Sequence, residues 1–214
     1  MRRMSVIVTA GVVTAALGAG AVTADGWISR LFGGGGEEAF AECRGGQVAG
    51  GAGEIGGPFT LVNAEGETVT DEDVITEPSI LYFGYTFCPD VCPLDTARNA
   101  AAVDILEERG HSVTPVFISV DPERDTPEVV GNFAANIHPR MIGLTGSPEQ
   151  VKAASDAYRT FYNVHDAGED DFYLVDHSTF SYLVLPGHGF VDFFRRDAGP
   201  EAMADRVQCF LEAS

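Results

Sequence analysis

Residues 79–93 read SILYFGYTFCPDVCP, and this stretch leads from a strand pattern into a helix pattern through two cysteines. Residues 79–85 form a short apolar run, which is typical of a strand buried on both faces. Apolar residues then recur at helical spacing over 94–109, and Gly110 ends the run. Pro93 suits the first position of that helix. The stretch therefore predicts a strand, a loop with two thiols and a helix in succession.

The rest of the sequence continues this alternation of strands and helices. Helix starts are indicated where a capping side chain precedes proline, at Thr126-Pro127 and Ser147-Pro148. This order matches a thioredoxin-like three-layer α/β/α fold with an N-terminal β-hairpin and a helix–strand insertion in the middle. The expected strands are 59–62, 67–69, 113–120, 141–144, 179–185 and 190–195, and the other expected helices are 125–137, 147–162 and 200–211.

The N-terminal residues are expected to precede the folded domain. Arg2 and Arg3 come before the uncharged stretch Ser5–Ala24, which as a helix would span about 30 Å, enough to cross a bilayer core. The arginines favour a cytoplasmic N-terminus and an exported body, which in a bacterium lies in the periplasm, anchored to the inner membrane. A cleaved signal peptide ending at Val22-Thr23-Ala24 is the alternative. We expect 1–30 to be this segment, 31–57 a flexible glycine-rich tether and 58–214 the domain.

Charge and composition exclude several classes of protein. The chain of 214 residues has 13 Lys and Arg against 32 Asp and Glu, a formal net charge of −19. Nucleic-acid binding needs clustered cations to neutralise phosphates, so this balance argues against it. The hydrophobic content of 45% is enough for a packed core, which argues against wholesale disorder.

The candidate chemistry concentrates at Cys88 and Cys92. Two thiols four positions apart on one loop can share a metal ion or form a disulfide. Cys92 is expected near the positive end of the helix dipole, which favours its thiolate. Thiolates favour monovalent copper, zinc or iron–sulfur chemistry. A copper or zinc site on this loop needs at least one further ligand from elsewhere in the chain.

The best candidate for that ligand is His177. It directly precedes the closing hairpin, a junction that in a thioredoxin-like fold lies beside the start of the cysteine helix. Thioredoxins place a cis-proline there, and an imidazole in its place shifts the interpretation from dithiol exchange toward metal binding. The other histidines are interpreted as surface or hydrogen-bonded residues: His111, His138, His165 and His188.

Three motifs together resemble the Sco/SenC family: CPDVCP at 88–93, SVDPERDTP at 119–127 and Asp176-His177-Ser178. The resemblance covers about residues 57–196. It implies a membrane-anchored, thioredoxin-like copper protein that assists assembly of the binuclear copper site of cytochrome c oxidase. The partners it implies are the copper-site subunit of that oxidase and other periplasmic copper chaperones.

The resemblance also implies roles for individual residues. Cys88, Cys92 and His177 correspond by position to the family's ligands for copper, as Cu(I), Cu(II) or both. Asp90 lies within the ligand loop, where we expect it to support the ligands or to contact a partner. For Asp121 we expect a structural role, capping the turn that follows it.

Three functions remain open from the sequence. The first is a copper-delivery metallochaperone, which is not an enzyme in the strict sense. The second is a thiol–disulfide oxidoreductase that reduces the metal-binding cysteines of an oxidase subunit, using Cys88 and Cys92 as the redox pair. The third is a peroxidase-like or redox-sensing thiol protein, which requires one strongly nucleophilic cysteine.

Cys43 and Cys209 lie outside the ligand motif. An even number of cysteines in an exported protein suggests pairing, so we expect a structural disulfide between them. The closed loop would lower the entropy of the unfolded chain by the equivalent of about 4–5 kcal/mol at most. Two separate free cysteines are the alternative.

Overall fold

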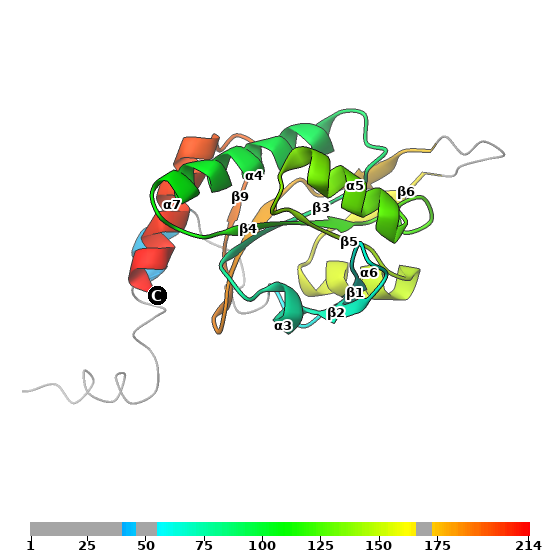
Figure 1. The fold of residues 1–214 in the computed structure, drawn as a ribbon, viewed down its shortest axis with the longest axis horizontal. Coiled ribbons are helices and arrows are strands. Elements are labelled where there is room, and N and C mark those ends of the chain that lie inside the picture. Colours follow the sequence, from blue (N-terminus) through cyan, green and yellow to red (C-terminus); the bar gives the residue numbers. More distant parts are fainter. Residues whose placement is uncertain (1–39, 46–54, 166–172) are drawn as a thin grey trace, which may run out of the picture. The chain divides into compact units, whose positions relative to one another are not determined.

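The computed structural model describes residues 40–45, 55–165 and 173–214, and its centre is a five-stranded mixed sheet (Figure 1). The strand order is β5-β4-β3-β8-β9. Neighbours are parallel from β5 to β3 and antiparallel from β3 to β9. The strands are β3 (Ser79–Gly84), β4 (Thr114–Ser119), β5 (Ile142–Leu144), β8 (Ser181–Leu185) and β9 (Gly189–Phe194).

Helices cover the sheet on both sides. In Figure 1, α4 and α5 lie on one side and α6 on the other, while α7 packs against α4. The alternation of side chains along β3 explains this arrangement. The Tyr82 hydroxyl reaches Asp95 on α4, whereas the ring of Phe83 contacts Tyr158 just after α6. The helices are α4 (Val91–Glu108), α5 (Pro127–Ile137), α6 (Pro148–Ala157) and α7 (Pro200–Ala213).

The expectation of a mixed α/β fold with an N-terminal hairpin and a helix–strand insertion is confirmed. The hairpin is β1 (Thr60–Val62) with β2 (Thr68–Thr70), and the insertion is α5 with β5. Each expected strand has its counterpart, with bounds that differ by one or two residues. A short helix that the sequence reading omitted, α3 (Asp71–Val74), follows β2 and is capped by the Thr70 side chain.

The expected helix over 147–162 is too long, which hid one strand, and a second strand at Val175–His177 was not expected. α6 ends at Ala157, and Arg159 adopts a positive φ of 50°, which breaks a helix. The chain then forms β6 (Tyr162–Val164), which pairs with β7 (Val175–His177) as a separate antiparallel ribbon. His177 is therefore a strand residue, on a ribbon that is not hydrogen-bonded into the main sheet.

Part of the expected tether belongs to the folded domain. Residues 40–43 are helical, and Phe40 is only 3% exposed because it packs against Phe210 of α7. Cys43 is joined to Cys209 by a disulfide across 166 positions of sequence. The expected leader and the rest of the tether, except for residues 55–57, lie outside the described residues. Within the described part of the chain, no helix is long and apolar enough to cross a membrane.

Candidate metal centre

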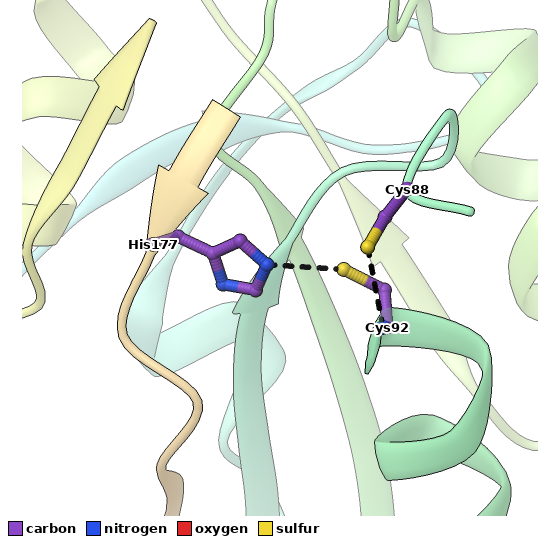
Figure 2. Close-up of side chains that lie close together, drawn as sticks. All are labelled: Cys88, Cys92 and His177. Carbon is purple, nitrogen blue, oxygen red and sulfur yellow. Dashed lines mark hydrogen bonds between the residues drawn. The ribbon is translucent and has the colours of Figure 1, made fainter. Parts of the chain in front are cut away.

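Cys88, Cys92 and His177 come together at one end of the sheet, although 85 positions separate Cys92 from His177. The Nε2 atom of His177 lies 3.2 Å from Cys92 Sγ, and the amide of Cys92 donates to Cys88 Sγ at 3.4 Å (Figure 2). The two sulfur atoms and an imidazole nitrogen all lie within 4.8 Å of one another. This spacing lets a single soft ion contact all three after small side-chain adjustments.

The local fold explains how the two thiols reach this position. β3 ends at Gly84, and the loop that follows carries Cys88 up to the first turn of α4. A Cβ atom at Gly84 would lie 2.9 Å from Cys92 Sγ, so only glycine lets the sulfur pack this closely against the strand. α4 begins at Val91, so Pro93 is the third helical residue. The expectation that it occupies the first position is wrong.

The two thiols differ in acidity. Cys88 is the more acidic, whereas the sequence predicted that the helix start would favour the thiolate of Cys92. The hydrogen bond with the Cys92 side chain, helped by the backbone amides of Cys92 and Asp90, lowers the pKa of Cys88 to about 4. The bond with Cys88 and burial raise the pKa of Cys92. The helix amides therefore favour the thiolate of Cys88, because its sulfur lies in front of the helix start while Cys92 Sγ lies beside β3.

Two tyrosines from β3 and its following loop surround the imidazole. The rings of Tyr82 and Tyr85 meet the His177 ring edge to face, with centroids 6.1 and 5.8 Å apart. The His177 Nδ1 atom lies 2.9 Å from the Ser178 carbonyl, which fits an Nδ1–H donor and leaves the Nε2 lone pair facing the sulfur atoms. That tautomer is the one required of a metal ligand at Nε2.

The two aspartates singled out from the sequence lie in different environments. Asp90 is the N-cap residue of α4, and its exposed side chain makes no capping bond. Asp121 is buried, and its carbonyl accepts the Asp125 amide within the turn. Its carboxylate instead accepts from Arg124 Nε at 2.5 Å and from the Tyr173 hydroxyl at 2.6 Å. The expectation that the Asp121 side chain caps the turn is therefore wrong: the backbone carbonyl closes the turn, and the carboxylate binds Arg124 and Tyr173.

Sequence reasoning overlooked the aromatic and basic residues around the ligands. Tyr82 and Tyr85 were assigned only to a buried strand, and Arg124 and Tyr173 were given no role. The sequence from Asp121 to Asp125 could have indicated a role for Arg124, since an arginine between two aspartates needs partners when it is buried. Besides Asp121, Arg124 binds Tyr173, which is 49 positions away and could not be identified from a local pattern.

Asp104, Glu107 and His138 form a second cluster of metal-binding residue types. The Arg140 amide donates to His138 Nδ1 at 3.1 Å, so the neutral ring carries its proton on Nε2, which faces Asp104 Oδ1 at 3.2 Å. Glu107 is paired with the Arg140 side chain. These contacts already engage the side chains that would bind a metal ion. His138 is therefore a hydrogen-bonded structural residue, as the sequence suggested.

Comparison with known proteins identifies relatives over most of the chain. The family model SCO1/SenC matches residues 47–212. The protein SenC of Rhodobacter capsulatus is 60% identical over 174 residues, which cover 81% of this chain and 78% of SenC. The mitochondrial SCO1 homolog 1 of Arabidopsis thaliana is 46% identical over 72% of this chain but only 46% of its own length. This chain thus spans about half of that plant relative.

Solved structures share the fold. A crystal structure of Arabidopsis thaliana ScoI with copper bound is 42% identical, has a TM-score of 0.70, and covers 75% of this chain and 99% of its own. BsSco, described as a member of the Sco family of cytochrome c oxidase assembly proteins with a disulfide switch, is 26% identical with a TM-score of 0.58, over 75% of this chain and 93% of its own. The resemblance inferred from the three sequence motifs is confirmed: the chain belongs to the SCO1/SenC family.

Proposed function

We propose that this protein is a copper-delivery metallochaperone that binds copper through Cys88, Cys92 and His177. The observation that carries the proposal is the convergence of two thiol sulfurs and an imidazole nitrogen within 4.8 Å. Two thiolates and one imidazole suit three-coordinate Cu(I), and a further donor can complete the sphere of Cu(II). The copper bound by relatives such as the Arabidopsis ScoI structure agrees with this donor set.

In this proposal the recipient is the copper-site subunit of cytochrome c oxidase, and other periplasmic copper chaperones supply the ion. The description of BsSco as a member of a family of oxidase assembly proteins supports this choice. The proposed location is the bacterial periplasm, with residues 1–30 as the anchor or signal and the following segment as the tether. The likeness to bacterial SenC is consistent with a bacterial origin.

Exposed apolar side chains around the ligands favour transfer through protein contact. In the described part of the chain, the exposed large apolar residues all lie on the ligand-bearing segments or pair with them, and they are 46–62% exposed. Phe87 precedes Cys88, and Leu94 follows Cys92 by two positions. We call this set the apolar rim: Phe87, Leu94, Phe161, Val164 and Leu174.

The β6–β7 ribbon brings the remaining rim residues to the site. Phe161 pairs through its carbonyl with the Ser178 amide, and Val164 is the cross-strand partner of Val175. Large apolar residues that gather at one place on a surface are typical of a binding surface. Exposed carboxylates accompany the rim at Asp90, Glu123 and Asp176. This surface therefore suits a partner with apolar side chains around its own soft ligands and basic residues at the edge.

Metal counting and absorption spectroscopy on the purified protein test the proposal. We expect one copper per chain and a thiolate-to-copper charge-transfer band, because a Cys–Cu(II) bond produces one. Replacing Cys88 or Cys92 with serine should abolish the band, and His177→Ala should weaken copper binding by at least about tenfold. Replacement of His138 with alanine is the matched control and should leave the stoichiometry unchanged. Full copper affinity in His177→Ala would refute the ligand set.

A thiol–disulfide oxidoreductase is the second candidate, favoured by the unequal acidity of the two thiols. Cys88 has its pKa lowered to about 4, and the nearby Cys92 is positioned to resolve a mixed disulfide. The disulfide switch described for BsSco agrees with this chemistry. The two functions separate at His177: if the reductase is the main activity, His177→Ala should keep dithiol exchange with a peptide disulfide while losing copper.

A further inference from the structure

The two halves of the candidate metal centre lie on different segments, and residues 178–180 join the His177 segment to β8, the neighbour of β3. The thiols lie at the start of α4, after the central strand β3, whereas His177 lies on β7 (Figure 2). β7 pairs only with β6, and this ribbon forms its own two-stranded sheet. The link to β8 brings the imidazole near the sulfur atoms, and side-chain contacts between this ribbon and the thiol loop can then fix its exact position.

The loop at residues 121–125 holds the cysteine half through Asp125. This carboxylate is fully buried, and it accepts the Thr86 amide at 3.0 Å and the Thr86 hydroxyl at 2.5 Å. The Ser119 hydroxyl at the end of β4 donates to it as well, at 2.6 Å. Thr86 is two residues before Cys88, so Asp125 ties the start of the thiol loop to the main sheet.

The same loop holds the histidine half through Asp121 and Arg124. The Tyr173 hydroxyl donates to Asp121 Oδ1 at 2.6 Å, and Arg124 Nη1 donates to the Tyr173 carbonyl at 2.9 Å. The guanidinium carbon lies 3.5 Å from the centre of the Tyr173 ring and 5.0 Å from that of Phe87. Burial and then the bond to Asp121 raise the pKa of Tyr173 to about 12, so its hydroxyl remains a donor at neutral pH.

Stability alone does not account for this arrangement. Asp121 is 1% exposed, and the side chain of Arg124 is 13% exposed, so both charges have lost most of their hydration. A buried ion pair of this kind often contributes little net stability. Arg124 Nη2 is also buried without a hydrogen-bond partner among the described residues. Such a cost is consistent with a role in fixing geometry at the metal centre.

We propose that the 121–125 loop is a bracket that sets the distance between the thiol pair and His177, with Asp121, Arg124 and Asp125 as positioning residues. One arm reaches Thr86 and the other reaches Tyr173, which lies two residues before the start of β7, the strand that carries His177. The inference rests on the proposed function, since it concerns the same ligands. It assigns to this loop control of copper affinity without direct contact with the ion.

Arg124→Lys tests the histidine arm, because lysine keeps the charge but loses the planar fork and the ring stacking. We expect copper affinity to fall about 10- to 100-fold, as is typical when a group that orients a ligand is changed. Thr86→Val should act in the same direction on the other arm, and Thr86→Ser, which keeps the hydroxyl, should restore affinity. Tyr173→Phe removes one hydroxyl and keeps the ring, so it remains informative if Arg124→Lys fails to fold.

A second readout does not require copper: the ring ¹⁵N and ¹H shifts of His177 in the metal-free reduced protein. We expect Arg124→Lys and Tyr173→Phe to change these shifts. The matched control is Asp192→Asn, since Asp192 on β9 is also buried and is paired with an arginine, Arg206 of α7. It should change thermal stability but neither the shifts nor the affinity. The bracket is refuted if the loop variants leave both readouts at wild-type values, or if Asp192→Asn changes them equally. Absence of copper binding in the wild type would refute the proposed function, while the shifts would still test the bracket.

Discussion

The two cysteine pairs of this chain have the same side chains but opposite chemistry. Cys43 and Cys209 are bonded, between a short N-terminal helix and α7, in a cluster with Phe40 and Phe210. Cys88 and Cys92 are free thiols beside an imidazole and the amides of a helix start. The first pair is surrounded by apolar groups that stabilise no thiolate. At the second pair, hydrogen bonds from the Cys92 side chain and from backbone amides stabilise the thiolate of Cys88.

This difference shows that the neighbours of a cysteine determine its use. A disulfide needs only two sulfurs held at bonding distance, and it acts chiefly on the unfolded chain. A site that binds and releases a metal needs an ionised sulfur, a neutral nitrogen ligand and an accessible face. The domain thus has a bonded cysteine pair at α7 and a free pair at the start of α4.

The largest effect is expected on the free energy of unfolding, when the bonded cysteine pair is removed. The double substitution of Cys43 and Cys209 with serine should lower the free energy of unfolding by about 2–5 kcal/mol, because the closed loop is long. Urea denaturation measures this loss. Copper affinity and the absorption spectrum should remain those of the wild type, and a loss of both would show that the two pairs are not independent.

A substitution beside the free pair should instead change the copper site together with stability. Gly84→Ala places a Cβ atom against Cys92 Sγ, so the sulfur or the strand must shift. We expect a stability loss of about 1–3 kcal/mol together with a changed copper spectrum. Gly199→Ala is the control, because its nearest contact would be 3.9 Å away at the end of the Glu201 side chain. A wild-type spectrum in Gly84→Ala would contradict the tight packing of Cys92.

The acidity of Cys88 can be tested by its reactivity. With a pKa of about 4, lowered from the value of a free thiol, Cys88 is already ionised at pH 6. Its alkylation by iodoacetamide in the reduced metal-free protein should therefore change little between pH 6 and 8. An ordinary thiol gains about tenfold in thiolate per pH unit over that range. Cys92→Ala should restore the steep dependence, since it removes the main cause of the low pKa.

The smallest effect is expected at the apolar rim. Leu94→Ser and Leu174→Ser should leave stability and copper affinity nearly unchanged, because both side chains are already more than half exposed. Copper transfer to a purified copper-site domain of an oxidase subunit should slow about fivefold, the equivalent of about 1 kcal/mol of contact. Transfer to a small chelator is the internal control and should keep its wild-type rate. Equal slowing of both transfers would exclude a docking role.

The sequence alone determined the family, the order of most elements and the residues of the candidate centre. Apolar runs and capping residues followed by proline have local physical causes, so β3, β4, α5 and the closing hairpin were predictable. The helix expected to extend to residue 162 failed because a single positive φ at Arg159, which no residue type there signals, ends it. His177 was predicted because it directly precedes the closing hairpin, and the order of strands and helices in the sequence is enough to place that junction beside the cysteine helix.

Only the tertiary structure decided which atoms meet. It showed that Cys88, and not Cys92, receives the helix amides, because the acidity of a thiol depends on which sulfur lies before the helix start. It also joined Asp121 and Arg124 to Tyr173, a contact between residues about 50 positions apart. Local patterns carry no information on such contacts. They arise when buried charges must find partners within a packed interior.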